Sequence, residues 1–366
     1  MSRKQIIFRA DSSLEIGTGH IMRCLSLADA LAKKGAQCLF LGRDLPGNIA
    51  SLIAERGHEL ICLTAPSHRA ETHQPGDLAH ASWLGVSWQE DARECAAHIK
   101  NLRSHWLIID HYGLDYRWQE IIKPFAHKLM VIDDLADRKH LADVLLDQNL
   151  GRSAQDYAGL VPQDCELRIG PAYALLRPEF SQLRATSMAR RQHAPVQQVM
   201  ISLGGIDKQN MAGRVLTALG QLELPEALIF NIVAGPTAPW LDELRKQAEG
   251  FIRPCKVYSG IKDMAHFMAD MDFAIGACGT SSWERACLGL PTLGLILAEN
   301  QIAGAKAMAQ AGIALLLDDT DLAESLRTGL EKMLDQQSRL QMAQQAASLT
   351  DGLGAPNLAE WMLASI

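Results

Sequence analysis

The first candidate site in this chain is a glycine-containing loop that ends in a histidine, Ile16-Gly17-Thr18-Gly19-His20. Gly17 and Gly19 allow the backbone to turn tightly and to approach a ligand. Apolar residues recur at helical spacing from His20 to Lys34, so His20 is expected at the start of a helix. The positive end of a helix disfavours an imidazolium cation, and a general base acting near pH 7 must be neutral. The simpler alternative is a glycine turn with a capping or solvent-exposed histidine.

A second cluster of polar side chains lies in Ile108-Ile109-Asp110-His111-Tyr112-Gly113, at the end of the apolar strand expected at 106–110. Residues at the carboxyl ends of parallel strands commonly bind the ligand. Side chains alternate along an extended segment, so Asp110, His111 and Tyr112 cannot all face one ligand. We expect at least one of them to face substrate. Alternatively, Asp110 caps the next turn and His111 is structural.

Two turns in the second half of the chain have the composition of a diphosphate site. Gly204-Gly205 follows the strand expected at 196–203, and Cys278-Gly279-Thr280-Ser281-Ser282-Trp283-Glu284 follows the strand expected at 272–276. Backbone N–H groups at the start of a helix bind anions, and Glu284 would accept hydrogen bonds from ribose hydroxyls. The alternative is an ordinary helix cap in which Glu284 complements the helix dipole.

Two further strand ends carry polar residues. Asp133-Asp134 follows the strand expected at 128–133 and is interpreted as fixing the next loop rather than as a metal site. Asn300, in Glu299-Asn300-Gln301, follows the strand expected at 292–297. It either caps the next helix or presents its amide to the ligand.

Composition and missing motifs exclude several classes of protein. The net charge of −7 makes the chain a poor candidate for binding nucleic acid. A dinucleotide fingerprint would need glycine where Met22 stands, and no P-loop sequence occurs. None of the eight cysteines forms a C-x-x-C pair or a zinc-site spacing, so we expect no metal or cofactor. No apolar run approaches 18 residues, and we expect a cytoplasmic protein with no membrane partner.

Strands and helices are predicted to alternate through both halves, and the strands read as continuous apolar runs. That pattern is typical of parallel sheets covered by helices on both faces, an α/β fold. The length of 366 residues predicts two similar domains, with a ligand in the cleft between them. The predicted boundaries are 1–190, 191–350 and a final helix at 351–366. The polar, basic segment 181–195 is interpreted as the linker, and 66–88 as a long loop.

Taken together, the motifs resemble a known family, the UDP-2,4-diacetamido-2,4,6-trideoxy-β-L-altropyranose hydrolases of pseudaminic acid biosynthesis. The chain is more distantly similar to the transferase that adds N-acetylglucosamine in peptidoglycan synthesis. Besides the loop before His20 and the segment 108–113, the resemblance rests on Phe8-Arg9-Ala10-Asp11-Ser12-Ser13, Tyr157-Ala158-Gly159-Leu160-Val161-Pro162, Gly170-Pro171-Ala172-Tyr173-Ala174-Leu175-Leu176-Arg177, Leu203-Gly204-Gly205-Ile206-Asp207 and Glu299-Asn300-Gln301.

The resemblance implies a GT-B architecture of two Rossmann-like domains, with UDP bound mainly by the C-terminal one and the last helix packed on the N-terminal one. It implies that His20 is catalytic and that Tyr112 and Asn300 line the active site. It also implies cleavage at the anomeric carbon with inversion and without metal. We expect Asp11 to position His20 or a sugar hydroxyl.

The expected function is therefore hydrolysis of the UDP-linked diacetamido sugar to free sugar and UDP, a step towards flagellin glycosylation and surface polysaccharide. The expected partner is the UDP-sugar alone, with a monomer favoured. The alternative on the same fold is a UDP-sugar glycosyltransferase, in which an acceptor hydroxyl replaces water. An alternative of another class is a UDP-sugar-binding protein without turnover.

Overall fold

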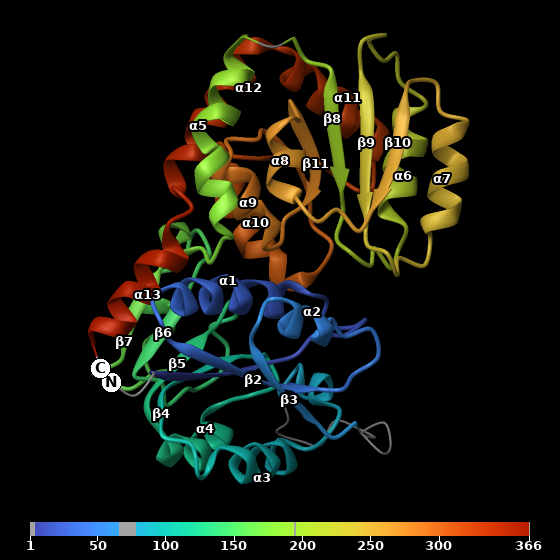
Figure 1. Cartoon of the computed structure of the whole chain (residues 1–366). Helices are drawn as coiled ribbons and strands as arrows, with labels where there is room; N and C mark the ends of the chain where they lie inside the picture. Colours follow the sequence, from blue (N-terminus) through green and yellow to red (C-terminus); the bar gives the residue numbers. More distant parts are fainter. Residues whose placement is uncertain (1–3, 66–77, 194, 366) are drawn as a thin grey trace. The chain divides into compact units, whose positions relative to one another are not determined.

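The computed structural model describes residues 4–65, 78–193 and 195–365. They form two compact units (Figure 1), unit 1 (Met1–Leu176 with Leu353–Ile366) and unit 2 (Arg177–Gly352). Each unit contains one parallel sheet with helices packed on it, which confirms the predicted α/β class. The chain passes from one unit to the next at 176–177, not at the predicted 190–191, and the last helix belongs to unit 1.

Unit 1 has the strand order β3-β2-β1-β4-β5-β6-β7. The strands are β1 (Gln5–Ala10), β2 (Gln37–Arg43), β3 (Glu59–Leu63), β4 (Ser104–Asp110), β5 (Ala126–Ile132), β6 (Val144–Asp147) and β7 (Glu166–Ile169). The helices are α1 (Gly19–Lys33), α2 (Ala50–Glu55), α3 (Trp88–Ile99), α4 (Tyr116–Ile122) and α13 (Gly354–Ala364), with short 3₁₀ turns η1 (Ala81–Leu84), η2 (Lys123–Phe125), η3 (Ala154–Tyr157) and η4 (Pro171–Tyr173).

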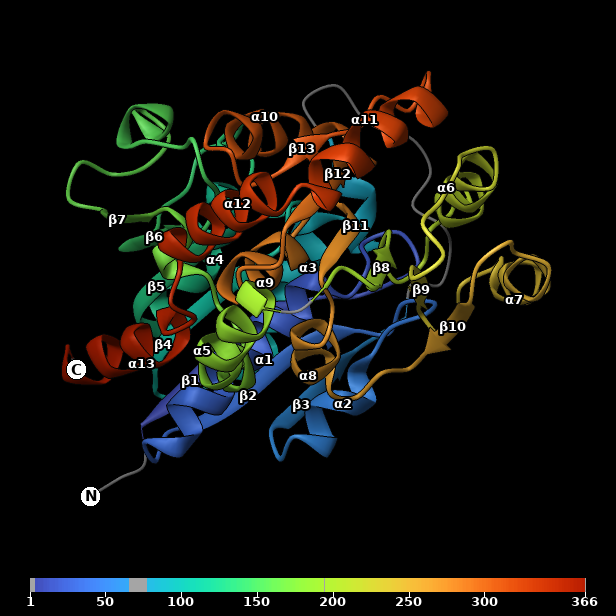
Figure 2. The same ribbon diagram turned by 90° about the horizontal axis from the view of Figure 1, so that it is seen from above.

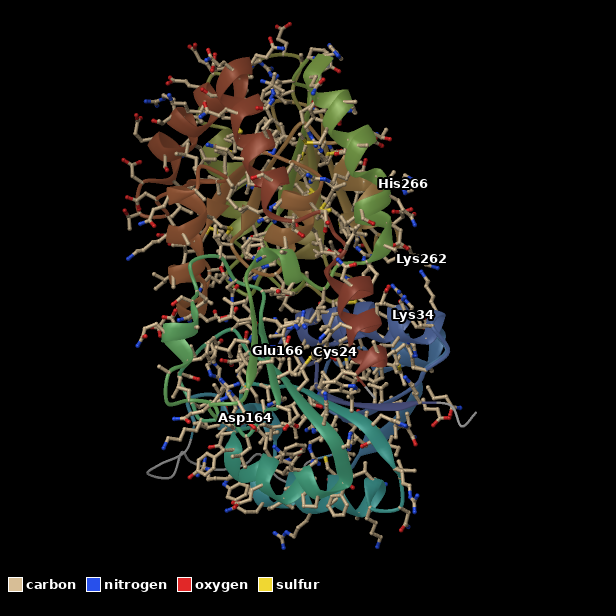
Figure 3. The ribbon with its side chains drawn as sticks, turned by 90° about the vertical axis from the view of Figure 1, so that its left-hand side faces the viewer. Cys24, Lys34, Asp164, Glu166, Lys262 and His266 are labelled. Atoms are coloured by element: carbon tan, nitrogen blue, oxygen red, sulfur yellow. The ribbon has the colours of Figure 1, made fainter. Side chains whose placement is uncertain are left out.

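The central strands of unit 1, β1, β4 and β5, are mostly buried because helices cover both faces of the sheet (Figure 1). Ile6 and Phe8 of β1 pack in one core cluster with α1 and α13. Ile7, between them, packs in a second cluster with α3 and α4. This alternation follows from the two-residue period of a strand. Lys34, labelled in Figure 3 just after α1, pairs with Glu360 of α13 at 3.0 Å.

Strand order decides which polar residues meet. β1 and β4 are neighbours, with Ala10 opposite Asp110, and β5 lies next to β4. Because all three strands are parallel, their carboxyl ends lie at one edge of the sheet. Asp110, the last residue of β4, and Asp134, just after β5, are therefore brought together although they are far apart in sequence.

Unit 2 has the strand order β10-β9-β8-β11-β12-β13. The strands are β8 (Gln198–Ser202), β9 (Ile229–Ala234), β10 (Cys255–Ser259), β11 (Phe273–Ala277), β12 (Thr292–Leu295) and β13 (Leu315–Leu316). The helices are α5 (Pro178–His193), α6 (Met211–Leu219), α7 (Leu241–Glu249), α8 (Met264–Ala269), α9 (Ser281–Cys287), α10 (Ile302–Gln310), α11 (Leu322–Leu334) and α12 (Gln336–Leu349), with the 3₁₀ turn η5 (Glu299–Gln301). Figure 2 shows α6, α7 and α11 on one face of the sheet and α5, α8 and α9 on the other.

The predicted linker at 181–195 is wrong, because most of that segment is the helix α5. Arg191 is buried and donates to the carbonyl oxygens of Met268, Met271 and Leu288, at or just after the ends of α8 and α9. Helix C-termini carry partial negative charge and unsatisfied carbonyls, so a guanidinium is stabilised there. The basic side chains that indicate a solvated linker thus help to pack α5 within unit 2.

The predicted long loop at 66–88 is only partly covered by the structure, because 66–77 lie outside the described residues. Within 78–88 the chain forms η1, and Ser87 then caps α3 by accepting a hydrogen bond from the Glu90 amide. No helix in the described ranges is long and apolar enough to cross a membrane.

Packing of α13 on unit 1 leads to a stability prediction. Leu358 is 2% exposed in the core cluster of α1 and α13, so Leu358→Ala should lower the free energy of unfolding by about 2–5 kcal/mol. Leu334→Ala, at a side chain 38% exposed on α11, is the control and should change stability by no more than about 0.5 kcal/mol. Urea unfolding measures both. Equal, small losses would contradict the packing of α13.

Candidate active site

The glycine loop after β1 is a tight turn that places His20 in the first turn of α1. The Gly17 amide donates to the Ser13 carbonyl at 2.9 Å, and Gly17 has a φ of +78°, which side-chain-bearing residues rarely adopt. The Ser13 hydroxyl accepts from two further amides of the loop. Gly19 is the first residue of α1, and His20 follows it. The predicted position of His20 at the start of a helix is confirmed.

His20 is held by a carboxylate at the end of β4. Its Nδ1 lies 2.5 Å from Asp110 Oδ1, and its side chain is 8% exposed. Burial would raise the pKa of Asp110, but the charge of Arg23 and the hydrogen bonds from Arg23 and His20 hold that pKa well below its usual range. An ionised carboxylate only accepts, so Nδ1 of His20 carries a proton, and in the neutral ring the lone pair is on Nε2.

The same carboxylate is bound by a buried arginine on α1. Arg23 donates from Nε and Nη2 to the two oxygens of Asp110 at 2.6 and 2.7 Å, and from Nη1 to Asp134 Oδ2 at 2.6 Å. The hydroxyl of Tyr112 donates to that Asp134 oxygen at 2.7 Å. His20, Asp110, Arg23, Asp134 and Tyr112 thus form one connected chain of contacts, here called the His20–Tyr112 network.

Aromatic rings surround the His20–Tyr112 network. The Tyr112 ring meets the edge of His20, with 4.7 Å between ring centroids, and stacks on Trp83 at 5.4 Å. The His80 ring lies 4.6 Å from Trp83 and 5.4 Å from Tyr112. Burial, together with the charge of Asp134, raises the pKa of Tyr112, so its hydroxyl remains a donor at neutral pH.

Asp11 contacts His20 in no described hydrogen bond, which does not fit the first of its two expected roles, positioning the base; that it binds a sugar hydroxyl stays a prediction. Its buried carboxylate accepts from Arg9 Nη1 at 2.6 Å and from the Arg43 amide at 2.7 Å. His111 Nε2 lies 3.4 Å from Asp11, while its Nδ1 accepts from the Gly113 amide. Asp11 and His111 therefore belong to a second buried cluster, and for His111 the structural interpretation fits.

Sequence reasoning missed three members of this site. Arg23 lies three residues after His20, on the same face of α1, a spacing that could have indicated it. Asp133 does fix the next loop, accepting from the Ala136 amide at 2.8 Å, but its neighbour Asp134 binds Arg23 and Tyr112. No periodic signal marked Trp83.

In unit 2, the Gly204-Gly205 turn offers open backbone. Gly204 has a φ of +93°, and no described atom lies within 4 Å of a Cβ built on either glycine. The turn is fixed by the Gly235 amide, which donates to the Gly205 carbonyl at 2.9 Å. The carboxylate of Asp207 accepts from two amides at the start of α6. A ligand could therefore approach this backbone closely.

The loop 278–282 is less open than the sequence indicates. The amides of Ser282 and Trp283 donate to carbonyls within the turn, at 2.9 and 3.2 Å. Ser282 is buried, and the hydroxyls of Ser281 and Ser282 accept from the buried guanidinium of Arg285 at 3.1 and 3.0 Å. The expectation that the backbone N–H groups of this turn are open to a diphosphate is therefore corrected for the amides of Ser282 and Trp283. Gly279 is half-buried and Thr280 exposed.

The remaining predicted residues of unit 2 have different surroundings. Burial raises the pKa of Glu284, although Arg177 lies 3.5 Å from its carboxylate. Asn300 is exposed in η5 and does not cap α10, whose cap position is taken by Gln301. No group of three or more histidine, cysteine, aspartate or glutamate side chains among the described residues could hold a metal ion.

The buried carboxyl group of Asp147, next to Asp134, has a pKa far above its ordinary value. Burial and the negative charge of Asp134 raise the pKa of Asp147 to about 7, although the Asn149 amide and the Tyr157 hydroxyl donate to it. The Tyr157 hydroxyl also contacts Asp133 at 3.2 Å. A single phenolic proton cannot satisfy both carboxylates, so a protonated Asp147 suits this cluster.

Asp147 therefore makes unit 1 less stable as the pH rises. In the unfolded chain the carboxyl group titrates near its ordinary pKa of 3.8. Between about pH 4 and 7 the folded protein holds a proton that the unfolded chain has lost, so stability falls by up to about 4 kcal/mol across this range. Asp147→Asn should remove that loss in urea unfolding, and Asp242→Asn, at a side chain 87% exposed, should not. Parallel pH curves for Asp147→Asn and the unmodified chain would contradict this.

Comparison with known proteins places the chain in a family. Residues 202–358 match the glycosyltransferase family 28 C-terminal domain. The chain is 31% identical over 250 residues to the UDP-2,4-diacetamido-2,4,6-trideoxy-β-L-altropyranose hydrolase of Campylobacter jejuni, covering 67% of this chain and 74% of that protein. It is 30% identical to the spore coat polysaccharide biosynthesis protein SpsG of Bacillus subtilis, over 94% of both chains.

A more divergent relative and a solved structure complete the comparison. Protein MJ1062 of Methanocaldococcus jannaschii is uncharacterised and 24% identical over 81% of this chain, which spans just over half, 56%, of that longer protein. The crystal structure of MurG from Acinetobacter baumannii superimposes with a TM-score of 0.69 over 99% of both chains at 15% identity, a likeness of fold. The two parallel-sheet units are thus those of the GT-B architecture, and the chain belongs to the family of the UDP-2,4-diacetamido-2,4,6-trideoxy-β-L-altropyranose hydrolases.

Proposed function

We propose that this protein hydrolyses UDP-2,4-diacetamido-2,4,6-trideoxy-β-L-altropyranose to the free sugar and UDP, a step of pseudaminic acid biosynthesis. One observation carries the proposal: Nδ1 of His20 donates to the ionised Asp110, so that the lone pair of the neutral ring is on Nε2. A histidine so held by a carboxylate is suited to take a proton from a nucleophile. Membership of the hydrolase family supports water as that nucleophile.

The proposed reaction is a single displacement at the anomeric carbon. Water attacks C1 from the face opposite UDP, its proton passes to Nε2 of His20, and the bond from C1 to the diphosphate oxygen breaks. The configuration at C1 is inverted. Asp110 stabilises the imidazolium that forms, because its carboxylate lies 2.5 Å from Nδ1. UDP is a good leaving group, so no strong general acid is required.

Other residues bind and orient the substrate on this proposal. Tyr112 lies against the His20 ring and orients water or an acetamido group. Asn300 does the same from its exposed position in η5. The open Gly204-Gly205 backbone and the turn at 279–281 bind the diphosphate, and Glu284 accepts from the ribose hydroxyls.

The compartment and the assembly are also part of the proposal. All eight cysteines lie in the described part of the chain and are free, which suits a reducing compartment such as the cytoplasm. We propose that the enzyme acts there as a monomer and without a metal ion.

A UDP-sugar glycosyltransferase is the second candidate, favoured by the match of residues 202–358 to a glycosyltransferase domain. The two candidates differ only in whether water or an acceptor hydroxyl attacks C1. The decisive measurement is UDP release from the purified chain with the UDP-sugar, in the presence of EDTA and without acceptor. We predict sustained release, with free sugar formed in equal amount.

Two results of that assay would contradict hydrolysis. UDP release that begins only when an acceptor alcohol is added would indicate a transferase. A UDP-sugar that raises the thermal unfolding temperature but yields no product, with or without acceptor, would indicate a binding protein.

Removing the proposed base gives a direct test of the mechanism. His20→Ala should lower kcat by roughly 10²–10⁴-fold, the usual contribution of a general base. His127→Ala is the matched control, because His127 is exposed at the start of β5, away from the strand ends that hold Asp110 and Asp134. Unchanged turnover in His20→Ala would rule out this histidine as the base.

A further inference from the structure

Arg23 connects the two residues of unit 1 that the proposed mechanism uses. Its guanidinium is bound to both oxygens of Asp110, the partner of His20, and to the Asp134 oxygen that accepts from Tyr112. The side chain is only 4% exposed. Arg23 does not face the reacting atoms, because its three nitrogens are directed to the two carboxylates.

Charge balance shows what Arg23 does for Asp110. Two carboxylates, Asp110 and Asp134, lie beside the single guanidinium of Arg23, and Nη2 of Arg23 lies 3.5 Å from Nδ1 of His20. An unpaired buried carboxylate next to an imidazole stabilises its protonated form. The guanidinium cancels much of that effect, while the hydrogen bond from Nδ1 to Asp110 is kept. Arg23 thus allows Asp110 to orient the ring without locking it as a cation.

Geometry gives Arg23 a second task. A guanidinium is planar, with donors in a fixed fork, so its bonds to Asp110 fix the plane of that carboxylate. Its third nitrogen fixes Asp134, and hence the direction of the Tyr112 hydroxyl. A lysine would keep the positive charge but could not hold both carboxylates in this fork.

We propose that Arg23 is a positioning residue that keeps His20 a neutral, correctly oriented base and aligns Tyr112 with it. The inference rests on the proposed function in that it assigns the base role to His20. The inference predicts one effect for loss of the positive charge of Arg23 and another for loss of its planar, forked set of donors. Two variants distinguish these effects.

Other charged or titratable groups face the same ring and must be unchanged in the comparison. The Sγ atom of Cys24, labelled in Figure 3, lies 3.6 Å from Asp110 Oδ2. Arg138 lies 5.7 Å from the centre of the Tyr112 ring. Among the described residues, the charged or titratable groups near His20 and its partners include, besides Arg23, Asp110, Asp134, Tyr112, Cys24, His80, His111 and Arg138.

The first variant, Arg23→Gln, removes the charge. It should move the acidic limb of the kcat/KM profile to higher pH by about one unit or more, because the unopposed carboxylates keep the ring protonated.

The second variant, Arg23→Lys, should leave that limb in place and lower kcat by about tenfold or more with little change in KM, because orientation is lost. Arg43→Gln is the matched control, a buried arginine of unit 1 paired with Asp91 and Glu94. Arg43→Gln should lower the unfolding temperature and leave the acidic limb of the kcat/KM profile at the same pH.

A readout without substrate separates this inference from the proposed function. Long-range ¹H–¹⁵N spectra report the protonation of each imidazole nitrogen, and His20→Gln identifies the His20 signals. In the unmodified chain the neutral ring should carry its proton on Nδ1, and in Arg23→Gln the ring should remain doubly protonated to higher pH. If these shifts occur in a chain that releases no UDP, the positioning role stands and hydrolysis fails.

Two results would overturn the inference. One is a folded Arg23→Gln whose His20 signals titrate as in the unmodified chain. The other, which applies even if Arg23→Gln does not fold, is an Arg23→Lys variant with unmodified kcat.

Discussion

The candidate site of unit 1 depends on keeping the carboxylate of Asp110 ionised in a place that water does not reach. Asp110 is fully buried at the end of β4. Removing a carboxylate from water costs several kcal/mol unless charged and hydrogen-bonding partners compensate for the loss. Arg23 and His20, one turn apart on α1, supply those partners. The ionised carboxylate in turn fixes which nitrogen of His20 carries a proton, and so which one can act as a base.

A second buried cluster of arginine and aspartate side chains lies at the same edge of the sheet, and its role differs from that of the first. Arg9 bridges Asp11 and Asp91 of α3, at 2.6 Å from each, and the Trp118 indole of α4 donates to Asp91. These partners come from the face of the sheet that α3 and α4 cover, whereas Asp110 contacts α1. The sheet therefore separates two ion clusters. The cluster around Arg9 joins β1 to α3 and α4, and the cluster around Asp110 holds His20 beside aromatic rings.

Much of this arrangement could be predicted from the sequence, because it depends on local patterns. Apolar runs separated by helical periodicity indicate two parallel sheets, and the glycines at 17 and 19 indicate a tight turn before His20. The choice between Asp11 and Asp110 as the partner of His20 could not be predicted. Both follow apolar strands, and only the pairing of β1 with β4 and the direction of each side chain decide which one faces α1.

The errors have the same physical origin, since tertiary contacts overrode composition. The segment 181–195 is predicted to be a linker because it is polar and basic, yet Arg191 is bound to carbonyls at the ends of two helices. The backbone N–H groups of the segment 278–284 are predicted to bind a diphosphate, yet the amides of Ser282 and Trp283 donate to carbonyls within the turn. Trp83 lies in a segment without periodicity, and only its stacking on Tyr112 places it at the site.

The central claim is that water, with its proton taken by His20, attacks the anomeric carbon of the UDP-sugar. The most direct test is a reaction in ¹⁸O-water with both products analysed by mass spectrometry. The account predicts one ¹⁸O atom in the free sugar, at C1, and none in UDP. Label in UDP and none in the sugar would mean attack at phosphorus and would contradict it.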